Sequence, residues 1–78
     1  MRRYLKDQNG AIYCYDDTTA VTLVFKYTRW KVSQYDYCYL KRNFSLQELT
    51  AAEAKYLTGG ADPDDVLEYY TTAYDVTM

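Results

Sequence analysis

The chain has 78 residues and a net charge of −2, and 49% of its residues are hydrophobic. This length suits one small domain, so we expect a single unit over residues 1–78. No segment approaches the roughly 18 apolar residues of a membrane span, and the lack of histidine removes the commonest general base and metal ligand.

The first predicted element is a β-hairpin with strands at about 3–7 and 11–15. Asn9 and Gly10 lie between these strands, and this dipeptide is the strongest short signal for a two-residue type I′ turn. Pairing around such a turn places apolar residues on one face of the hairpin and tyrosines on the other. The expected opposite pairs are Leu5 with Cys14 and Tyr4 with Tyr15.

Two more strands are predicted, at about 20–28 and 34–41. The first alternates Val21, Leu23, Phe25 and Tyr27 with mostly smaller or polar residues. The alternation then changes phase, which predicts a bulge or turn near 29–33. In the second strand one face is a row of phenols, which other tyrosines of the hairpin can extend. This tyrosine face comprises Tyr35, Tyr37 and Tyr39 with Tyr4, Tyr13 and Tyr15.

Two helices are predicted to follow, at about 46–58 and 63–74. Two residue pairs have the spacing of a capping box, so the first helix has two possible starts: Ser45 with Glu48, and Thr50 with Glu53. Gly59-Gly60 supplies its left-handed end. Asp62 caps the second helix, and Pro63 occupies its first position.

This order predicts a two-layer α+β domain with an antiparallel sheet of three to four strands followed by two helices. The helices are expected to cover the apolar face of the sheet and to leave the tyrosine face open. That apolar face contains Leu5, Ile12, Cys14, Leu23, Phe25, Cys38 and Leu40. In a cytoplasmic protein, the two cysteines are expected to be reduced core thiols, with a cross-strand disulfide as the alternative.

Two short stretches bear a resemblance to phage proteins. The stretch from Lys6 to Asp16 resembles the opening hairpin of small bacteriophage proteins of the tail-fibre-assembly type, and Leu49 to Ala54 is similar to a capped helix start found later in them. In size and in its acidic, tyrosine-bearing second helix, the chain also resembles small anti-CRISPR inhibitors. These resemblances imply a phage or mobile-element protein, which would act in the cytoplasm of a host cell.

Catalysis and metal binding are not expected. The cysteines lack the C-x-x-C spacing of a redox or zinc site. Asp62, Asp64 and Asp65 are better explained as a cap and a complement to the helix dipole than as ligands of a cation. We therefore expect no enzyme, cofactor or metal site.

Charge and tyrosine content favour a binding function. Residues 1–42 carry a net charge of +4 and residues 43–78 a net charge of −6, an asymmetry that favours oriented encounter with a charged partner. The candidate partner-binding residues from the second helix are Asp62, Asp64, Asp65, Glu68, Tyr69, Tyr70 and Tyr74. Those from the rest of the chain are Tyr35, Tyr37, Tyr39 and Trp30, although Trp30 also suits a core.

Three functions follow from these residues. In the first, the acidic helix mimics nucleic acid and inhibits a host protein or ribonucleoprotein complex that handles nucleic acid, such as a CRISPR effector. In the second, the sheet binds single-stranded nucleic acid through Trp30, the tyrosine row and the cations Lys26, Arg29, Lys31, Lys41 and Arg42. In the third, the tyrosine face joins subunits of a virion or tail-fibre assembly. The sequence leaves the target, the host and the oligomeric state open.

Overall fold

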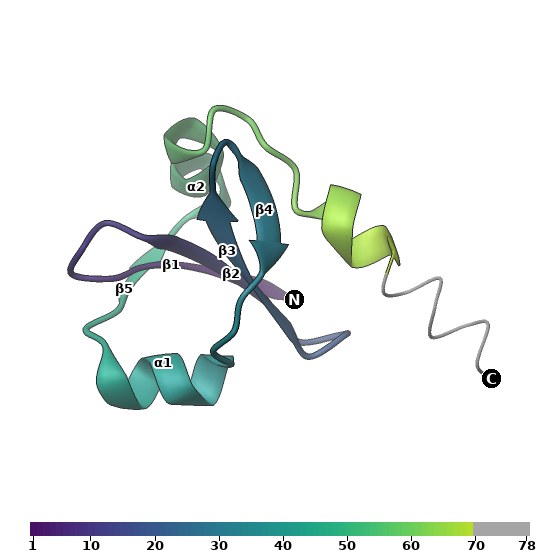
Figure 1. Ribbon diagram of the computed structural model, residues 1–78. Coiled ribbons are helices and arrows are strands. Elements are labelled where there is room, and N and C mark those ends of the chain that lie inside the picture. The colour runs from purple at the N-terminus through teal and green to yellow at the C-terminus, as the bar shows by residue number, and fades with distance from the viewer. Residues whose placement is uncertain (70–78) are drawn as a thin grey trace, which may run out of the picture.

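The computed structural model describes residues 1–69 and has an α+β fold built on a five-stranded antiparallel sheet (Figure 1). The strands are β1 (Arg2–Lys6), β2 (Ile12–Asp16), β3 (Val21–Lys26), β4 (Arg29–Val32) and β5 (Gln47–Leu49), in the order β4-β3-β2-β1-β5 across the sheet. The helices are α1 (Tyr37–Asn43) and α2 (Ala51–Leu57), and residues 64–69 form a further helical segment. The predicted fold class, an antiparallel α+β domain, is confirmed.

The hairpin of β1 and β2 forms as predicted, but its turn is wider than two residues. The amide of Asp7 donates to the carbonyl oxygen of Ala11 at 3.0 Å, and Gly10 has a φ of 87°. The Asp7 carboxylate also accepts hydrogen bonds from the amides of Asn9 at 2.8 Å and Ala11 at 2.9 Å. These bonds stabilise a loop in which residues 8–10 lie outside the paired strands.

The predicted register of this hairpin is therefore wrong by one residue. Tyr4 lies opposite Cys14, and Leu5 lies opposite Tyr13. Since side chains alternate between the faces of a strand, the shift places Tyr4 on the face of Cys14 and Leu5 on the face of Tyr13. Tyrosines and apolar residues are consequently mixed on both faces.

A tight turn joins β3 to β4, so the strand predicted at 20–28 ends earlier than expected. The turn residues are Tyr27, with a φ of 52°, and Thr28, with a φ of 67°. A two-residue turn reverses the phase of the alternation, and it places Phe25 opposite Trp30. The phase change near 29–33 thus has its origin in a turn at 27–28, and β4 is an additional strand.

The strand predicted at 34–41 is wrong, because residues 37–43 form α1. The side chain of Asp36 caps this helix by accepting a hydrogen bond from the amide of Tyr39 at 2.8 Å. Leu40 is fully buried against the sheet, which gives the helix an apolar anchor. Lys41 and Arg42 occupy the last turn, where positive charge complements the helix dipole.

The helix predicted at 46–58 begins at the second of its two candidate sites. The Thr50 hydroxyl accepts a hydrogen bond from the amide of Glu53 at 3.1 Å, and the Glu53 carboxylate accepts one from the amide of Thr50 at 2.9 Å. The preceding residues form β5, which pairs with β1. Ser45 does not form a capping box with Glu48, whose carboxylate instead accepts a hydrogen bond from Arg3 at 2.8 Å.

The second predicted helix begins near the expected place. Gly59 and Gly60, with φ values of 66° and 87°, follow α2, as the sequence predicts for a helix end. The Asp62 carboxylate accepts a hydrogen bond from the amide of Asp64 at 2.9 Å, and the helical segment begins just after Pro63. The remainder of the predicted span, 70–74, lies outside the described residues.

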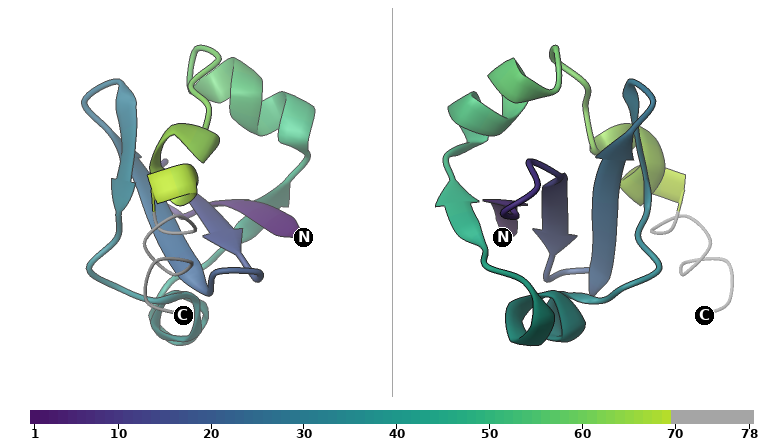
Figure 2. Two further views of the ribbon diagram at one scale, coloured as in Figure 1. Left: turned by 90° about the vertical axis from the view of Figure 1, so that its right-hand side faces the viewer. Right: turned by 60° about the vertical axis from the view of Figure 1, so that its left-hand side comes forward.

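Both faces of the sheet are covered, whereas the sequence predicted one covered face. Figures 1 and 2 show α1 and α2 on different sides of the sheet. On the face toward α2, here called the α2 face, the buried residues are Ile12, Cys14, Leu23, Trp30, Leu49, Ala54 and Leu67. On the opposite side, here called the α1 face, they are Leu5, Tyr13 and Leu40. Cys38 was expected in the core, but it is exposed.

Within residues 1–69, no helix has the length and apolar character needed to cross a bilayer.

Candidate binding surfaces

The expected open row of tyrosines does not form. Tyr35 and Tyr39 stack on each other at the start of α1, with their ring centroids 4.4 Å apart and their planes 9° apart. Tyr37 stacks instead on Tyr15 of β2, at a centroid distance of 4.6 Å. Tyr35 and Tyr37 are half-buried, and Tyr39 is 43% exposed. The helix therefore covers much of the surface that the sequence predicted to be free.

Tyr13 lies within the core of the α1 face and is 7% exposed. Its hydroxyl donates a hydrogen bond to the Asp7 carboxylate at 3.0 Å. Burial raises the pKa of Tyr13 to about 12, and the hydrogen bond and negative charge of Asp7 add to the effect. This phenol stabilises the hairpin loop, and its hydroxyl is held by Asp7.

An open hollow remains on the α1 face beside β3 and β4, and we call it the basic–aromatic groove. It has a volume of about 380 Å³. Tyr27, 80% exposed, stands at its rim, and the Lys31 ammonium lies 5.0 Å from the centroid of the Tyr27 ring. The lining residues are Ala11, Tyr13, Val24, Lys26, Tyr27, Lys31, Val32, Ser33, Gln34 and Tyr35.

Tyr27 is an exposed aromatic residue of this groove that the sequence did not predict as a binding residue. The alternating pattern places it in the predicted strand, whereas the structure places it in the turn after β3. The change of phase between Lys26 and Arg29 is the signal that locates this turn. Had the turn been predicted at 27–28, Tyr27 would have been expected at the end of a hairpin.

Trp30 is a core residue, being only 4% exposed. Its ring packs edge-on against Phe25 at a centroid distance of 5.5 Å. Its Nε1–H donates a hydrogen bond to the carbonyl oxygen of Ala61 at 3.2 Å. Trp30 therefore links the α2 face to the loop before the second helix and does not present its ring to a partner.

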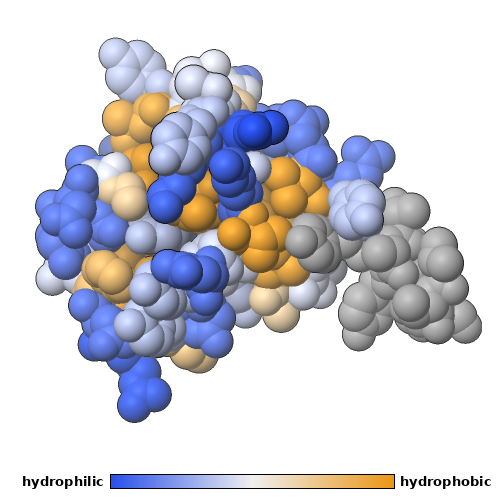
Figure 3. All heavy atoms as spheres, viewed as in Figure 1, coloured by the Kyte–Doolittle hydropathy of each residue, from blue (hydrophilic) through white to orange (hydrophobic). Residues whose placement is uncertain are grey.

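The acidic segment, here defined as residues 62–68, lies over the α2 face. Leu67 belongs to the core cluster that contains Trp30, and Pro63 is also buried. In Figure 3 hydrophobic residues reach the surface near this helical segment and are bordered by hydrophilic ones. Asp62 and Asp65 point into solvent from this anchored backbone. The segment thus presents exposed carboxylates above a buried support.

The other acidic and tyrosine residues of this predicted site differ in their surroundings. Asp64 is exposed and forms an ion pair with Arg2. Glu68 and Tyr69 are also exposed, but Tyr70 and Tyr74 lie outside the described residues. The structure therefore brings the acids of 62–68 together, and it separates them from the tyrosines around α1, which contact the other face of the sheet.

Arg2 also reaches Asp16, whose carboxylate lies 3.6 Å from the Arg2 Nε. Burial alone raises the pKa of Asp16, but hydrogen bonds from the hydroxyl and amide of Thr19 and the charge of Arg2 together lower it. The Arg2 guanidinium is accordingly held between two carboxylates. It is unlike Lys26 and Lys31, neither of which forms an ion pair within residues 1–69.

Within residues 1–69, no three potential metal ligands cluster. Cys14 is buried, and this burial raises the pKa of its thiol to about 11. Cys38 lies on the surface of α1, so the two thiols are separated and unpaired.

Comparison with known proteins found no matching family model, curated protein or solved structure.

Proposed function

We propose that this protein inhibits a host nucleic-acid-handling complex by placing the acidic segment in a basic groove of that complex. A CRISPR effector is one complex with such a groove. Carboxylates form strong, charge-assisted hydrogen bonds with arginine and lysine, and complementary charge accelerates association. The protein would act as a ligand of fixed shape, without turnover of a substrate.

The observation that carries this proposal is the anchoring of exposed carboxylates to a buried support. Leu67 is 3% exposed, and the Trp30 indole holds the carbonyl of Ala61 just before the segment. A preorganised charged surface loses less conformational entropy on binding than a mobile one. Asp62 and Asp65 are consequently better suited to recognition than carboxylates on a flexible chain.

The test is affinity capture from a bacterial lysate that has been enriched for nucleic-acid-binding proteins. Asp62→Asn with Asp65→Asn removes two negative charges, while asparagine retains the capping group at position 62. The control is Gln47→Lys with Ala52→Lys, which changes the net charge by the same amount at exposed sites outside the segment. We expect the first variant to lose the captured proteins and the control to retain them.

If both variants captured the proteins as well as the unchanged protein does, the acidic segment would be removed from the proposal. Loss of capture by both would mean that net charge, and not the position of the carboxylates, controls binding. Circular dichroism of each variant checks that the fold is retained.

A further inference from the structure

We propose that the basic–aromatic groove on the α1 face is a binding site for single-stranded nucleic acid. Such ligands need ring surfaces for their bases and cations for their phosphates. The groove offers both, and it lies on the opposite face of the sheet from the acidic segment. The inference therefore stands independently of the protein target proposed above.

The cations of the groove are positioned by strand pairing. Lys31 lies opposite Val24, and Lys26 follows Val24 by two residues on β3, so both lysines share its face. Within residues 1–69 neither lysine forms an ion pair, whereas Arg2 and Arg3 both do. The charges of Lys26 and Lys31 are therefore available to an anionic ligand.

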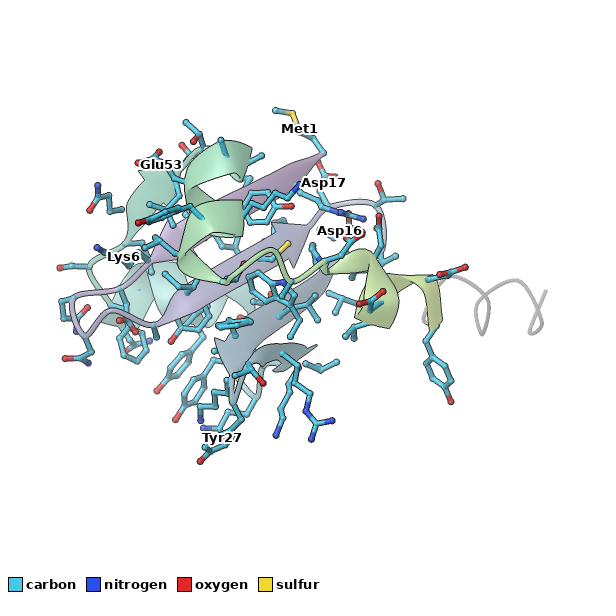
Figure 4. All side chains as sticks on the ribbon, turned by 90° about the horizontal axis from the view of Figure 1, so that it is seen from above. Met1, Lys6, Asp16, Asp17, Tyr27 and Glu53 are labelled. Atoms are coloured by element: carbon cyan, nitrogen blue, oxygen red, sulfur yellow. The ribbon has the colours of Figure 1, made fainter. Side chains whose placement is uncertain are left out.

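Two ring surfaces border these lysines. Tyr27 is largely exposed beside the Lys31 ammonium, and Tyr35 lines the groove while stacking on Tyr39. Figure 4 shows Tyr27 at the end of the β3–β4 hairpin, far from Met1, Asp17 and Glu53. A base can stack on an exposed phenol while the neighbouring ammonium contacts its phosphate, which is the combination used by single-strand binders.

The backbone of the turn is unusual for the two residues that form it. Tyr27 and the β-branched Thr28 both have positive φ, a conformation in which glycine and asparagine are much more favourable. A tyrosine that is largely exposed gains little stability from packing in return. Strained backbone of this kind is concentrated at functional sites.

The acidic segment and the two lysines lie on different faces of the sheet. The acidic segment contacts the core of the α2 face, whereas Lys26 and Lys31 share the face of Val24. Arg29 is left out of the proposed site because it also lines a hollow that contains Asp62 and Asp65. The proposed phosphate contacts are therefore Lys26 and Lys31.

The experiment is fluorescence anisotropy with labelled oligothymidylate and oligouridylate of about 12 nucleotides, within the site sizes of known single-strand modules. We expect saturable binding that weakens with salt. Tyr27→Ala should lower affinity about 5- to 100-fold, and Tyr27→Phe should stay within about twofold because it retains the ring. Tyr56→Ala is the matched control, since Tyr56 is 85% exposed on α2.

The lysines are tested through the salt dependence. Lys26→Gln and Lys31→Gln should each reduce the slope of log K against log salt by about 0.7, the value for one phosphate contact with a single strand. Lys55→Gln, which changes an exposed lysine of α2, should leave the slope unchanged. The two oligonucleotides differ in the sugar 2′-hydroxyl and in the C5-methyl group of the base, so a preference between them would show which strand is favoured within the same ligand class.

Several results would overturn the site. These are no saturable binding, an affinity for duplex equal to that for the single strand, displacement of the labelled strand by polyglutamate as effective as by unlabelled oligonucleotide, or unchanged affinity of Tyr27→Ala. The two proposals also fail separately. The Asp62→Asn/Asp65→Asn variant is expected to retain oligonucleotide binding. The double variant Lys26→Gln/Lys31→Gln is expected to retain protein capture. Loss of oligonucleotide binding in the Asp62/Asp65 variant would contradict the separation of the two surfaces.

Discussion

The Trp30 indole donates a hydrogen bond to the carbonyl oxygen of Ala61 at 3.2 Å and so joins β4 to the loop before the acidic segment. The same side chain packs with the buried residues of the α2 face, among them Leu23 and Leu67. One residue thus supports both the core and the orientation of the proposed binding segment.

Replacing Trp30 tests this double role. Trp30→Ala should lower the free energy of unfolding by about 3–5 kcal/mol, because it leaves a large cavity in the core. Trp30→Phe should cost less, because a ring remains and only the hydrogen bond and part of the volume are lost. Urea denaturation measures both changes. Tyr56→Ala, on the exposed surface of α2, is the control, and its free energy of unfolding should stay within about 0.5 kcal/mol of that of the unchanged protein. A change as small as this for Trp30→Ala would contradict the buried position of Trp30.

Burial of the Tyr13 phenol, together with its hydrogen bond to Asp7, predicts a loss of stability at high pH. The pKa of Tyr13 is raised to about 12 in the folded protein, against about 10 in an unfolded chain. The neutral phenol is therefore favoured by folding, and its stabilising contribution is complete below about pH 10 and lost as the pH rises toward about 12. Near neutral pH, Tyr13→Phe should cost about 0.5–1.5 kcal/mol.

The measurement for this pair is urea denaturation of Tyr13→Phe and the unchanged protein near pH 8 and near pH 11. The difference between the two proteins should shrink at the higher pH, since phenylalanine has no proton to lose. A constant difference would show that Tyr13 does not ionise with a raised pKa.

The two thiols should differ strongly in reactivity. Cys38 is exposed on α1, whereas Cys14 is fully buried and has its pKa raised to about 11 by that burial. A thiol-specific reagent should therefore modify Cys38 rapidly and Cys14 only after denaturation, because the thiolate is the reactive form. Cys38→Ser should abolish the rapid phase. Rapid labelling of Cys14 in that variant would contradict its position in the core.

The lowered pKa of Asp16 predicts a loss of stability in acid. Burial tends to raise its pKa, but the hydrogen bonds from Thr19 and the charge of Arg2 give it a net lowered pKa in the folded protein. Its contribution is therefore present above the unfolded pKa of about 3.9 and is lost as the pH falls through the lower, folded value. Asp16→Asn should cost about 1–3 kcal/mol near neutral pH.

Denaturation of Asp16→Asn and the unchanged protein near pH 7 and near pH 2.5 provides the measurement. The cost of the substitution should become smaller at the lower pH, because the unfolded chain is then largely protonated at Asp16 and the lowered pKa of the folded state contributes less to stability. An equal cost at the two pH values would show that the carboxylate charge is not involved.

Local signals in the sequence predicted several elements well. Thr50 with Glu53 and Asp62 with Pro63 have capping chemistry that depends on near neighbours, and helices begin at both places. The hairpin around Asn9 was also predicted, but its register was not, because the Asp7 carboxylate stabilises a wider loop.

The elements that the sequence did not predict depend on contacts between distant residues. The alternating tyrosines of 35–39 fit either a strand or a helix, and the choice is made by Leu40, which packs against Leu5 and Tyr13 of the sheet. The turn at Tyr27 and Thr28 lacks the glycine or asparagine that usually marks such turns. The predicted acids 62–65 come together because they are neighbours in the sequence. The basic–aromatic groove, in contrast, depends on a strand pairing that the sequence pattern did not reveal.

The most direct test of the central claim is competition between this protein and nucleic acid for the captured host complex. The Lys26→Gln/Lys31→Gln variant is used as bait, so that added nucleic acid does not compete by binding the bait itself. If the acidic segment occupies a groove that normally holds nucleic acid, an excess of duplex or single-stranded fragments should release the complex. A captured complex that withstands that excess, at a salt concentration where its own nucleic acid exchanges, would contradict the claim.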